Sequence, residues 1–115
     1  MAFAETASVK GNPTVYALSP QIKKYTLRDV GFSLTRAGNF QLERPLDPSL
    51  PYNQAIKLKI TVAKDLKTFK MAVTTGNGLQ TINIFKQAQQ KDKVTQFNFV
   101  IENLLKRQVL EIKKA

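Results

Sequence analysis

Residues 55–64, AIKLKITVAK, decide the fold of this chain because apolar side chains stand at every second position. The apolar positions are Ile56, Leu58, Ile60 and Val62, and the positions between them are Lys57, Lys59, Thr61 and Ala63. A period of two residues is typical of an antiparallel strand with one buried face and one face in water. We therefore predict a half-buried strand here.

The same alternation recurs in the two segments that follow. They are TFKMAVTT at residues 68–75 and LQTINIF at residues 79–85. We predict a turn at Asp65-Leu66 and a two-residue hairpin turn at Asn77-Gly78, a strong short hairpin signal. With these turns, apolar residues of neighbouring strands lie opposite one another. A shift of the strand register by one residue would turn the apolar side chains of one strand to the other face. The predicted pairs are Val62 with Phe69, Ile60 with Met71, Leu58 with Val73, Val73 with Ile82 and Met71 with Ile84. Residues 55–86 are thus predicted to form a three-stranded meander.

The glycine pair in TTGNGLQ, residues 74–80, raises a second interpretation, a loop that holds a phosphate. Such a loop needs glycines that open a helix, so that backbone N–H groups converge on the anion. Here the glycines lead into a predicted strand. We therefore interpret the stretch as a turn.

Another hairpin is predicted for residues 32–44, FSLTRAGNFQLER. Leu34 opposite Leu42 would leave Ala37-Gly38-Asn39 as a three-residue loop, which needs a residue in the left-handed conformation. Residues 6–20 are predicted to form one or two short strands around a turn at Gly11-Asn12-Pro13.

Two helices are predicted. The first begins at Pro20 after a Ser19 N-cap, or at Leu27 in a shorter alternative, and ends at Gly31. The second follows an Asp92 N-cap. Its apolar stripe is Val94, Phe97, Val100, Ile101, Leu104 and Leu105. The tail, residues 108–115, is either a short edge strand or an extension of this helix.

These elements predict an α+β fold for a single domain over residues 1–115. Its antiparallel sheet has about five strands, and two helices pack on one face of that sheet.

Cysteine and histidine are both absent from the 115 residues. Their absence excludes disulfides, thiolate or imidazole zinc sites and nucleophiles paired with histidine. The acidic residues are scattered, so we expect no metal site, no cofactor and no catalytic residue. The chain has no apolar run long enough to span a membrane and no secretory signal at its start, so we expect a cytoplasmic protein without membrane contact.

The net charge of +10 favours an anionic partner such as RNA or a small anionic ligand. The predicted outer face of the sheet presents Gln41, Glu43, Lys57, Lys59, Thr61, Lys70, Thr74, Thr81, Asn83 and Phe85. We predict Lys57, Lys59, Lys70 and Phe85 as the residues that would bind a ligand or nucleic acid. The alternative is a solvated face, because antiparallel sheets commonly leave one side wet.

Phe99 falls on the polar side of the second predicted helix. It is predicted either to contact a protein partner or a second copy in a homodimer, or to be a single exposed apolar residue. An enzymatic alternative would need a carboxylate or lysine site around Glu43, Asp47 or Lys59.

The stretches GNF…ER.LDP and F.M..TTGNG.Q..NIF carry a resemblance to a small bacterial family. The family is of unknown function, is labelled with a role in amino-acid metabolism and is often encoded near a cysteine desulfurase. The likeness extends over nearly the whole chain, and no catalytic motif comes with it. It implies a non-enzymatic accessory or interaction protein linked to amino-acid or sulfur metabolism. Binding of nucleic acid or a phosphate ligand on the basic sheet face is the alternative function.

Overall fold

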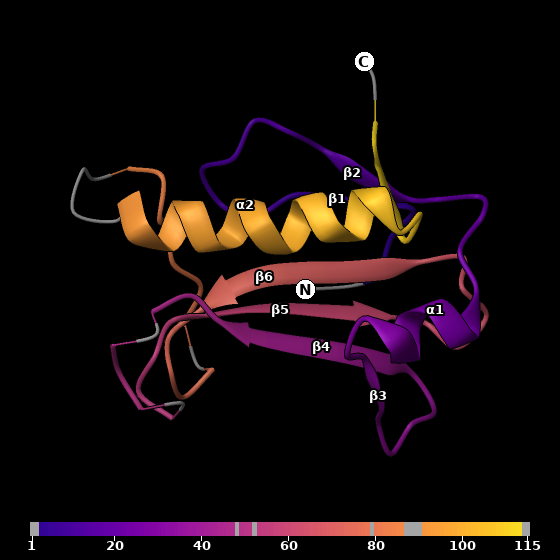
Figure 1. The fold of residues 1–115 in the computed structure, drawn as a ribbon, viewed down its shortest axis with the longest axis horizontal. Coiled ribbons are helices and arrows are strands. Elements are labelled where there is room, and N and C mark those ends of the chain that lie inside the picture. The colour runs from indigo at the N-terminus through magenta and orange to yellow at the C-terminus, as the bar shows by residue number, and fades with distance from the viewer. Residues whose placement is uncertain (1–2, 48, 52, 79, 87–90, 114–115) are drawn as a thin grey trace.

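The computed structural model describes residues 3–47, 49–51, 53–78, 80–86 and 91–113, which form two helices and two antiparallel sheets (Figure 1). The four-stranded sheet has the order β3 (Ser33–Leu34), β4 (Phe40–Pro45), β5 (Lys57–Val62) and β6 (Phe69–Thr74). The three-stranded sheet has the order β1 (Thr6–Ala7), β2 (Tyr16–Leu18) and β7 (Leu110–Ile112). The helices are α1 (Lys24–Asp29) and α2 (Lys91–Lys106). The α+β class is confirmed, but the single sheet of about five strands was wrong.

The alternating segment at residues 55–64 forms β5, which lies between β4 and β6. Its register against β6 is the predicted one, with Val62 opposite Phe69, Ile60 opposite Met71 and Leu58 opposite Val73. Leu66 closes the turn with a positive φ of 60°. The inward side chains of both strands are at most 1 % exposed, so the alternation correctly identified the core face.

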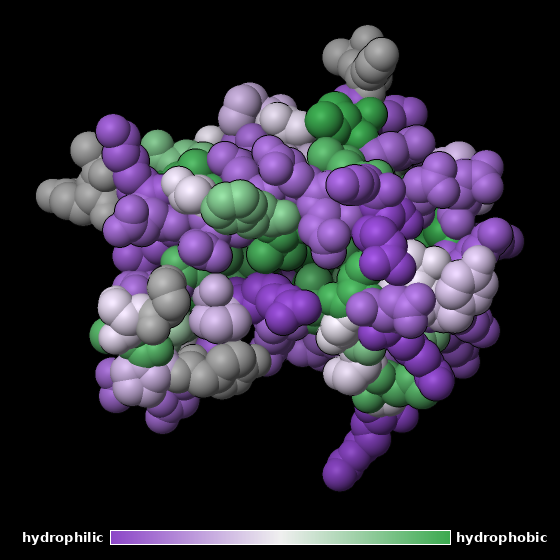
Figure 2. Space-filling view, in the orientation of Figure 1, coloured by the Kyte–Doolittle hydropathy of each residue, from purple (hydrophilic) through white to green (hydrophobic). Residues whose placement is uncertain are grey.

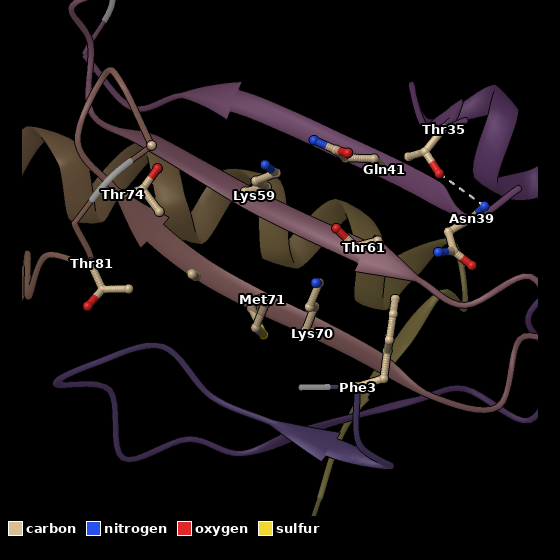
Figure 3. A pocket seen from close by; sticks show the side chains of 12 residues that line it. Phe3, Thr35, Asn39, Gln41, Lys59, Thr61, Lys70, Met71, Thr74 and Thr81 are labelled. Atoms are coloured by element: carbon tan, nitrogen blue, oxygen red, sulfur yellow. Dashed lines mark hydrogen bonds between the residues drawn. The ribbon is translucent and has the colours of Figure 1, made fainter. Parts of the chain in front are cut away.

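Helix α2 lies across one face of the four-stranded sheet (Figures 1 and 3). Phe97, Ile101 and Leu104 are its buried residues, and they belong to the same hydrophobic core as Leu58 and Ile60. The predicted apolar stripe is therefore confirmed. The helix begins at Lys91, so Asp92 lies within its first turn, where a negative charge stabilises the helix dipole, and not at the predicted N-cap.

The second sheet joins the two ends of the described chain. Strand β2 pairs with β1 on one side and with β7 on the other. Residues 110–112 of the tail thus form an edge strand, which was one of the two predicted states of the tail. The turn between β1 and β2 spans residues 9–12, where the Asn12 N–H donates to the Val9 carbonyl at 3.1 Å, so it lies slightly before the predicted Gly11-Asn12-Pro13. This sheet is separate from the first because β2 and β7 bond to each other and neither bonds to β3–β6.

The predicted third strand of the meander was wrong beyond its first residues. Thr74 pairs with Thr81 as predicted, and the Ile82 N–H donates to the Val73 carbonyl at 2.8 Å. The turn is wider than the predicted two residues, since the Gly78 N–H donates to the Thr75 carbonyl. The far end of the β6 edge is then occupied by other residues. The backbones of Ala4 and Phe69 exchange two hydrogen bonds of 3.0 and 2.9 Å there.

The chain after Ile82 therefore turns away from β6. The Asn83 side chain accepts a hydrogen bond from the Phe85 N–H at 2.9 Å and packs against Gly11, where a Cβ atom would lie 2.1 Å from the Asn83 Oδ1. Ile84 is fully buried but does not pair with Met71 as predicted.

The hairpin at residues 32–44 forms with a register different from the predicted one. Leu34 lies opposite Phe40 and not opposite Leu42, and it is 54 % exposed. The loop is residues 36–38, with Gly38 at a φ of +88° in the last loop position. That position needs the left-handed conformation, which glycine adopts more readily than Asn39.

Helix α1 begins between its two predicted starts. Ser19 and Pro20 form a separate turn, in which the Ile22 N–H donates to the Ser19 carbonyl at 3.1 Å. The helix ends as predicted at Gly31, whose φ is +107°. The Gly31 N–H donates to the Arg28 carbonyl and the Phe32 N–H to the Leu27 carbonyl, a Schellman C-cap.

Candidate polar ligand site

The outward face of the four-stranded sheet carries the candidate site, on the side turned away from α2 (Figure 3). We call this surface the polar face and define it by Gln41 on β4, Lys59 and Thr61 on β5, and Lys70, Ala72 and Thr74 on β6. On β5 and β6 these residues alternate with the apolar core residues, so the same periodicity that makes the core also makes this face.

A cavity of about 410 Å³ opens on the polar face. Two ammonium groups line it, those of Lys59 and Lys70, together with the aromatic ring of Phe3. Its hydroxyl and amide groups belong to Thr35, Asn39, Gln41, Thr61, Thr74 and Thr81. No aspartate or glutamate is among the described residues that line it, so the cavity is positively charged.

Lys59 is partly exposed and has a carboxylate beside it. Its Nζ lies 3.9 Å from the Glu43 Oε2, and the two side chains are 43 % and 35 % exposed. A pair this exposed is screened by water and contributes little to stability. The Lys59 ammonium therefore remains available to a ligand in the cavity.

Lys70 is held by an aromatic ring. Its Nζ lies 4.9 Å from the centre of the Phe3 ring, a cation–π contact. Phe3 is placed there by the next residue, Ala4, whose backbone pairs with Phe69 on the edge of β6. The structure gives Lys70 no carboxylate partner among the described residues.

Thr61 and Thr74 are polar but nearly covered, at 7 % and 9 % exposed. Neither hydroxyl has a hydrogen-bond partner among the described residues of the chain. Buried polar side chains are normally hydrogen-bonded, and an unsatisfied one costs free energy. Two such hydroxyls in one cavity leave donors and acceptors for a bound molecule.

The predicted ligand residue Lys57 lies outside this cavity. It is 7 % exposed, and its Nζ donates to the Gly76 carbonyl oxygen at 3.1 Å. Lys57 thus holds the turn after β6, while Lys59 and Lys70 come together at the cavity.

Phe85 also lies away from the polar face. Its ring packs edge-to-face on that of Phe97, with centroids 5.4 Å apart and an interplanar angle of 89°. Because residues 83–86 do not continue the strand, the predicted outward orientation of Phe85 was wrong. The aromatic ring of the polar face is that of Phe3.

The enzymatic alternative would need a site around the carboxylates of Glu43 or Asp47. Glu43 and Asp47 are absent from the cavity lining, and the described residues contain no group of three or more acidic, cysteine or histidine side chains that could hold a metal. Hydrogen bonds from the Ser49 hydroxyl and N–H lower the pKa of Asp47, with a smaller contribution from Lys93. A carboxyl group with a lowered pKa is a poor general acid near neutral pH.

Comparison with known proteins places the chain in a family. The model of the DUF1831 family, described as "Putative amino acid metabolism", matches residues 1–111. The chain belongs to the DUF1831 family. The crystal structure of a DUF1831 family protein from Lactobacillus plantarum is 46% identical in sequence and has a TM-score of 0.90. That match covers 98% of this chain and 99% of the other. No curated protein matches the chain.

The family resemblance drawn from the sequence is therefore confirmed. The family description names an area of metabolism and no reaction or ligand. Within the described residues, no helix has both the length and the apolar character needed to cross a membrane.

Phe99 lies on the other side of the molecule from the polar face. It is 62 % exposed and lines a groove of about 390 Å³ between α2 and β4. Figure 2 shows hydrophobic side chains between the polar ones in the middle of the face viewed there. Apolar neighbours in the groove are Val30, Leu42, Pro45, Val100 and Leu104. The exposure predicted for Phe99 is confirmed, and whether a partner covers it stays a prediction.

Sequence reasoning missed two residues that line the cavity, Phe3 and Ala72. Nothing in the local pattern connects Phe3 with β6, because the Ala4–Phe69 pairing joins distant parts of the chain. Ala72 could have been found, since it is the one small side chain between Lys70 and Thr74 on the outward positions of β6.

Proposed function

We propose that this DUF1831 family member is a cytoplasmic, non-enzymatic accessory protein of amino-acid metabolism that binds a small anion on its polar face. The family description supports the metabolic area. The lack of histidine and cysteine in the sequence supports a binding role over a catalytic one.

One observation carries this proposal: Lys59 and Lys70 share a cavity of about 410 Å³ whose described lining contains no acidic side chain. Glu43 lies beside Lys59, but Lys70 has no carboxylate partner among the described residues. One carboxylate does not offset two ammonium groups, and a bound anion would remove the remaining repulsion. Ligand sites are typically concave and of this size, with a few convergent polar groups.

Binding of single-stranded RNA is the alternative on the same face, and the net charge of +10 supports it. Sheet surfaces that bind single-stranded RNA stack successive bases on two or three aromatic rings. The polar face offers Phe3, while Phe85 is half-buried and packs on Phe97. The cavity therefore favours a small anion over a nucleic acid strand.

Isothermal titration calorimetry at low salt tests the proposal, with inorganic phosphate, benzoate and a ten-nucleotide RNA as probes. The double variant Lys59→Gln/Lys70→Gln should lose small-anion binding by about tenfold or more, because hydrogen bonds to charged groups are worth roughly 1.5–3 kcal/mol each. The matched control is Lys67→Gln/Lys106→Gln, which removes the same charge at two exposed positions outside the cavity.

The control variant should bind the small anions as the wild type does. Failure of every small anion to bind, or equal loss in both double variants, would contradict the proposal. RNA binding that exceeds small-anion binding and weakens steeply with salt would favour the alternative instead.

A protein partner that acts in the same metabolism would complete an accessory role. The groove beside Phe99 is the surface we assign to it, as a partner contact or a homodimer contact. Sedimentation velocity of the wild type and of Phe99→Asp tests the homodimer. A dimer that persists in Phe99→Asp would contradict the involvement of this residue.

A further inference from the structure

The centre of the polar face is a square of four residues on two strands. Lys59 lies directly opposite Ala72, and Thr61 lies directly opposite Lys70. The two lysines therefore occupy one diagonal of the square, and the two short side chains, Thr61 and Ala72, occupy the other. We call this arrangement the lysine square.

Diagonal neighbours on adjacent strands are roughly 7–8 Å apart, within reach of long side chains. The flexible stems of Lys59 and Lys70 can thus bring both ammonium groups to a single oxyanion. The short side chains of Thr61 and Ala72 leave the space between the lysines open, and all four residues line the cavity.

Hydroxyl donors lie beside the two ammonium groups. Thr61 is a corner of the square, and Thr74 is the next outward residue after Ala72 on β6. Both residues are more than nine-tenths buried, and their hydroxyls have no hydrogen-bond partner among the described residues. Figure 3 shows both threonines on the same face as the lysines.

We propose that the lysine square binds the phosphate group of a small organic phosphate monoester, whose organic part contacts Phe3. This inference rests on the proposed function and narrows its ligand class. A phosphate monoester carries a charge of about −1.5 to −2 at neutral pH and three acceptor oxygens. That charge matches two ammonium groups, and those oxygens can accept from the ammonium and threonine donors together.

Two other anion classes fit the cavity less well. A free amino acid carries an ammonium group beside its carboxylate, and that group would meet two lysines and no acidic side chain in the described lining. A simple carboxylate has one negative charge and a planar shape that arginine recognises through two parallel hydrogen bonds. The described lining contains lysines and no arginine.

The organic part of the ligand has one apolar surface available beside the square. Phe3 is 37 % exposed and lies against Lys70, so a group attached to the phosphate reaches the ring. Phenyl phosphate is therefore a suitable probe, since it combines the phosphate monoester with an aromatic ring.

Calorimetric titration with phenyl phosphate, inorganic phosphate, benzoate and glutarate tests the ligand class. We expect phenyl phosphate to bind at least about tenfold more tightly than benzoate, and Phe3→Ala to remove its advantage over inorganic phosphate. Equal or tighter binding of benzoate or glutarate would overturn the phosphate assignment and leave the anion-binding function intact. Failure of all four probes would overturn both.

Ala72→Leu tests the place of binding without a change in charge. A leucine fills the space between the lysines, so phenyl phosphate binding should fall at least tenfold while the urea unfolding midpoint stays close to that of the wild type. A folded Ala72→Leu protein that binds phenyl phosphate normally would overturn the lysine square as the site.

Thr61→Val gives a second, independent readout. Valine has nearly the shape of threonine and favours strands, and it removes a buried hydroxyl that lacks a partner. We expect the variant to unfold at a higher urea concentration and to bind phenyl phosphate several-fold more weakly. A lower unfolding midpoint, or unchanged binding, would contradict the role of Thr61 as a ligand donor.

Discussion

The ammonium of Lys57 lies 3.1 Å from the carbonyl oxygen of Gly76, and the whole residue is 7 % exposed. Lys59 stands two residues further along the same face of β5, yet its side chain is 43 % exposed. The two lysines are equivalent in the sequence pattern and different in the structure. One holds a turn, and the other faces the cavity.

Lys57→Met should therefore lower the free energy of unfolding by about 1–3 kcal/mol, because it removes a hydrogen bond from a charged donor and leaves the Gly76 carbonyl without it. Urea denaturation measures this change. Lys59→Met is the matched control and should cost less than about 1 kcal/mol, as expected for an exposed ion pair. Equal costs for the two variants would contradict the division of roles.

Phe97 and Phe99 are two residues apart on α2, with exposed fractions of 0 % and 62 %. Phe97→Ala should cost about 3–5 kcal/mol because it opens a cavity in the core. Phe99→Ala should change the free energy of unfolding by about 0.5 kcal/mol or less. Thermal and urea unfolding of the two variants measure the difference, and a large loss in Phe99→Ala would show that this ring packs on the protein itself.

Gln108 follows α2 with a φ of 62°, and the Val109 N–H donates to the Leu104 carbonyl at 2.9 Å in a Schellman C-cap. Glycine adopts this left-handed conformation without the steric cost of a Cβ atom. Gln108→Gly should stabilise the protein by about 0.5–1 kcal/mol, because relief of the left-handed strain exceeds the extra chain entropy that glycine loses on folding. Gln108→Val is the opposite variant, and it should be destabilised because a β-branched residue is strained there.

Asp47 contributes a dependence of stability on pH. Hydrogen bonds from Ser49 lower its pKa below the ordinary value of 3.8, so the folded state holds the ionised form more strongly than the unfolded state does. The stability that this provides is present above that ordinary value and is lost as the pH falls through the folded pKa.

In urea unfolding from pH 7 to pH 3, the wild type should thus exceed Asp47→Asn in stability at pH 7, and the difference should shrink below about pH 4. Ser49→Ala removes the hydroxyl donor and should show a smaller version of the same effect. A difference that stays constant over the whole range would contradict this origin.

The spacing of apolar residues along the chain predicted those parts of the fold in which residues close in sequence are also close in space. The alternation around Ile60 gave the register of β5 against β6, because a slip by one residue would have turned every apolar side chain to water. The apolar stripe of α2 identified Phe97, Ile101 and Leu104 as its buried side for the same reason.

Prediction was wrong where distant segments compete for one edge. Ala4 occupies the end of β6 that a third strand would have needed, and Phe85 consequently packs on Phe97 and not on the polar face. In the hairpin at residues 32–44, both registers kept the buried face, so the choice depended on which residue takes the left-handed loop position.

The sequence alone determined that this chain is α+β, that it lacks the residues of histidine or cysteine chemistry, and that lysines line the outward face of its central strands. These properties follow from composition and from a period of two residues. Only the tertiary structure decided that Lys59 and Lys70 share a cavity with Phe3 while Lys57 is buried on a carbonyl oxygen. Those contacts join segments far apart in the chain, and their free energy comes from packing that no local pattern encodes.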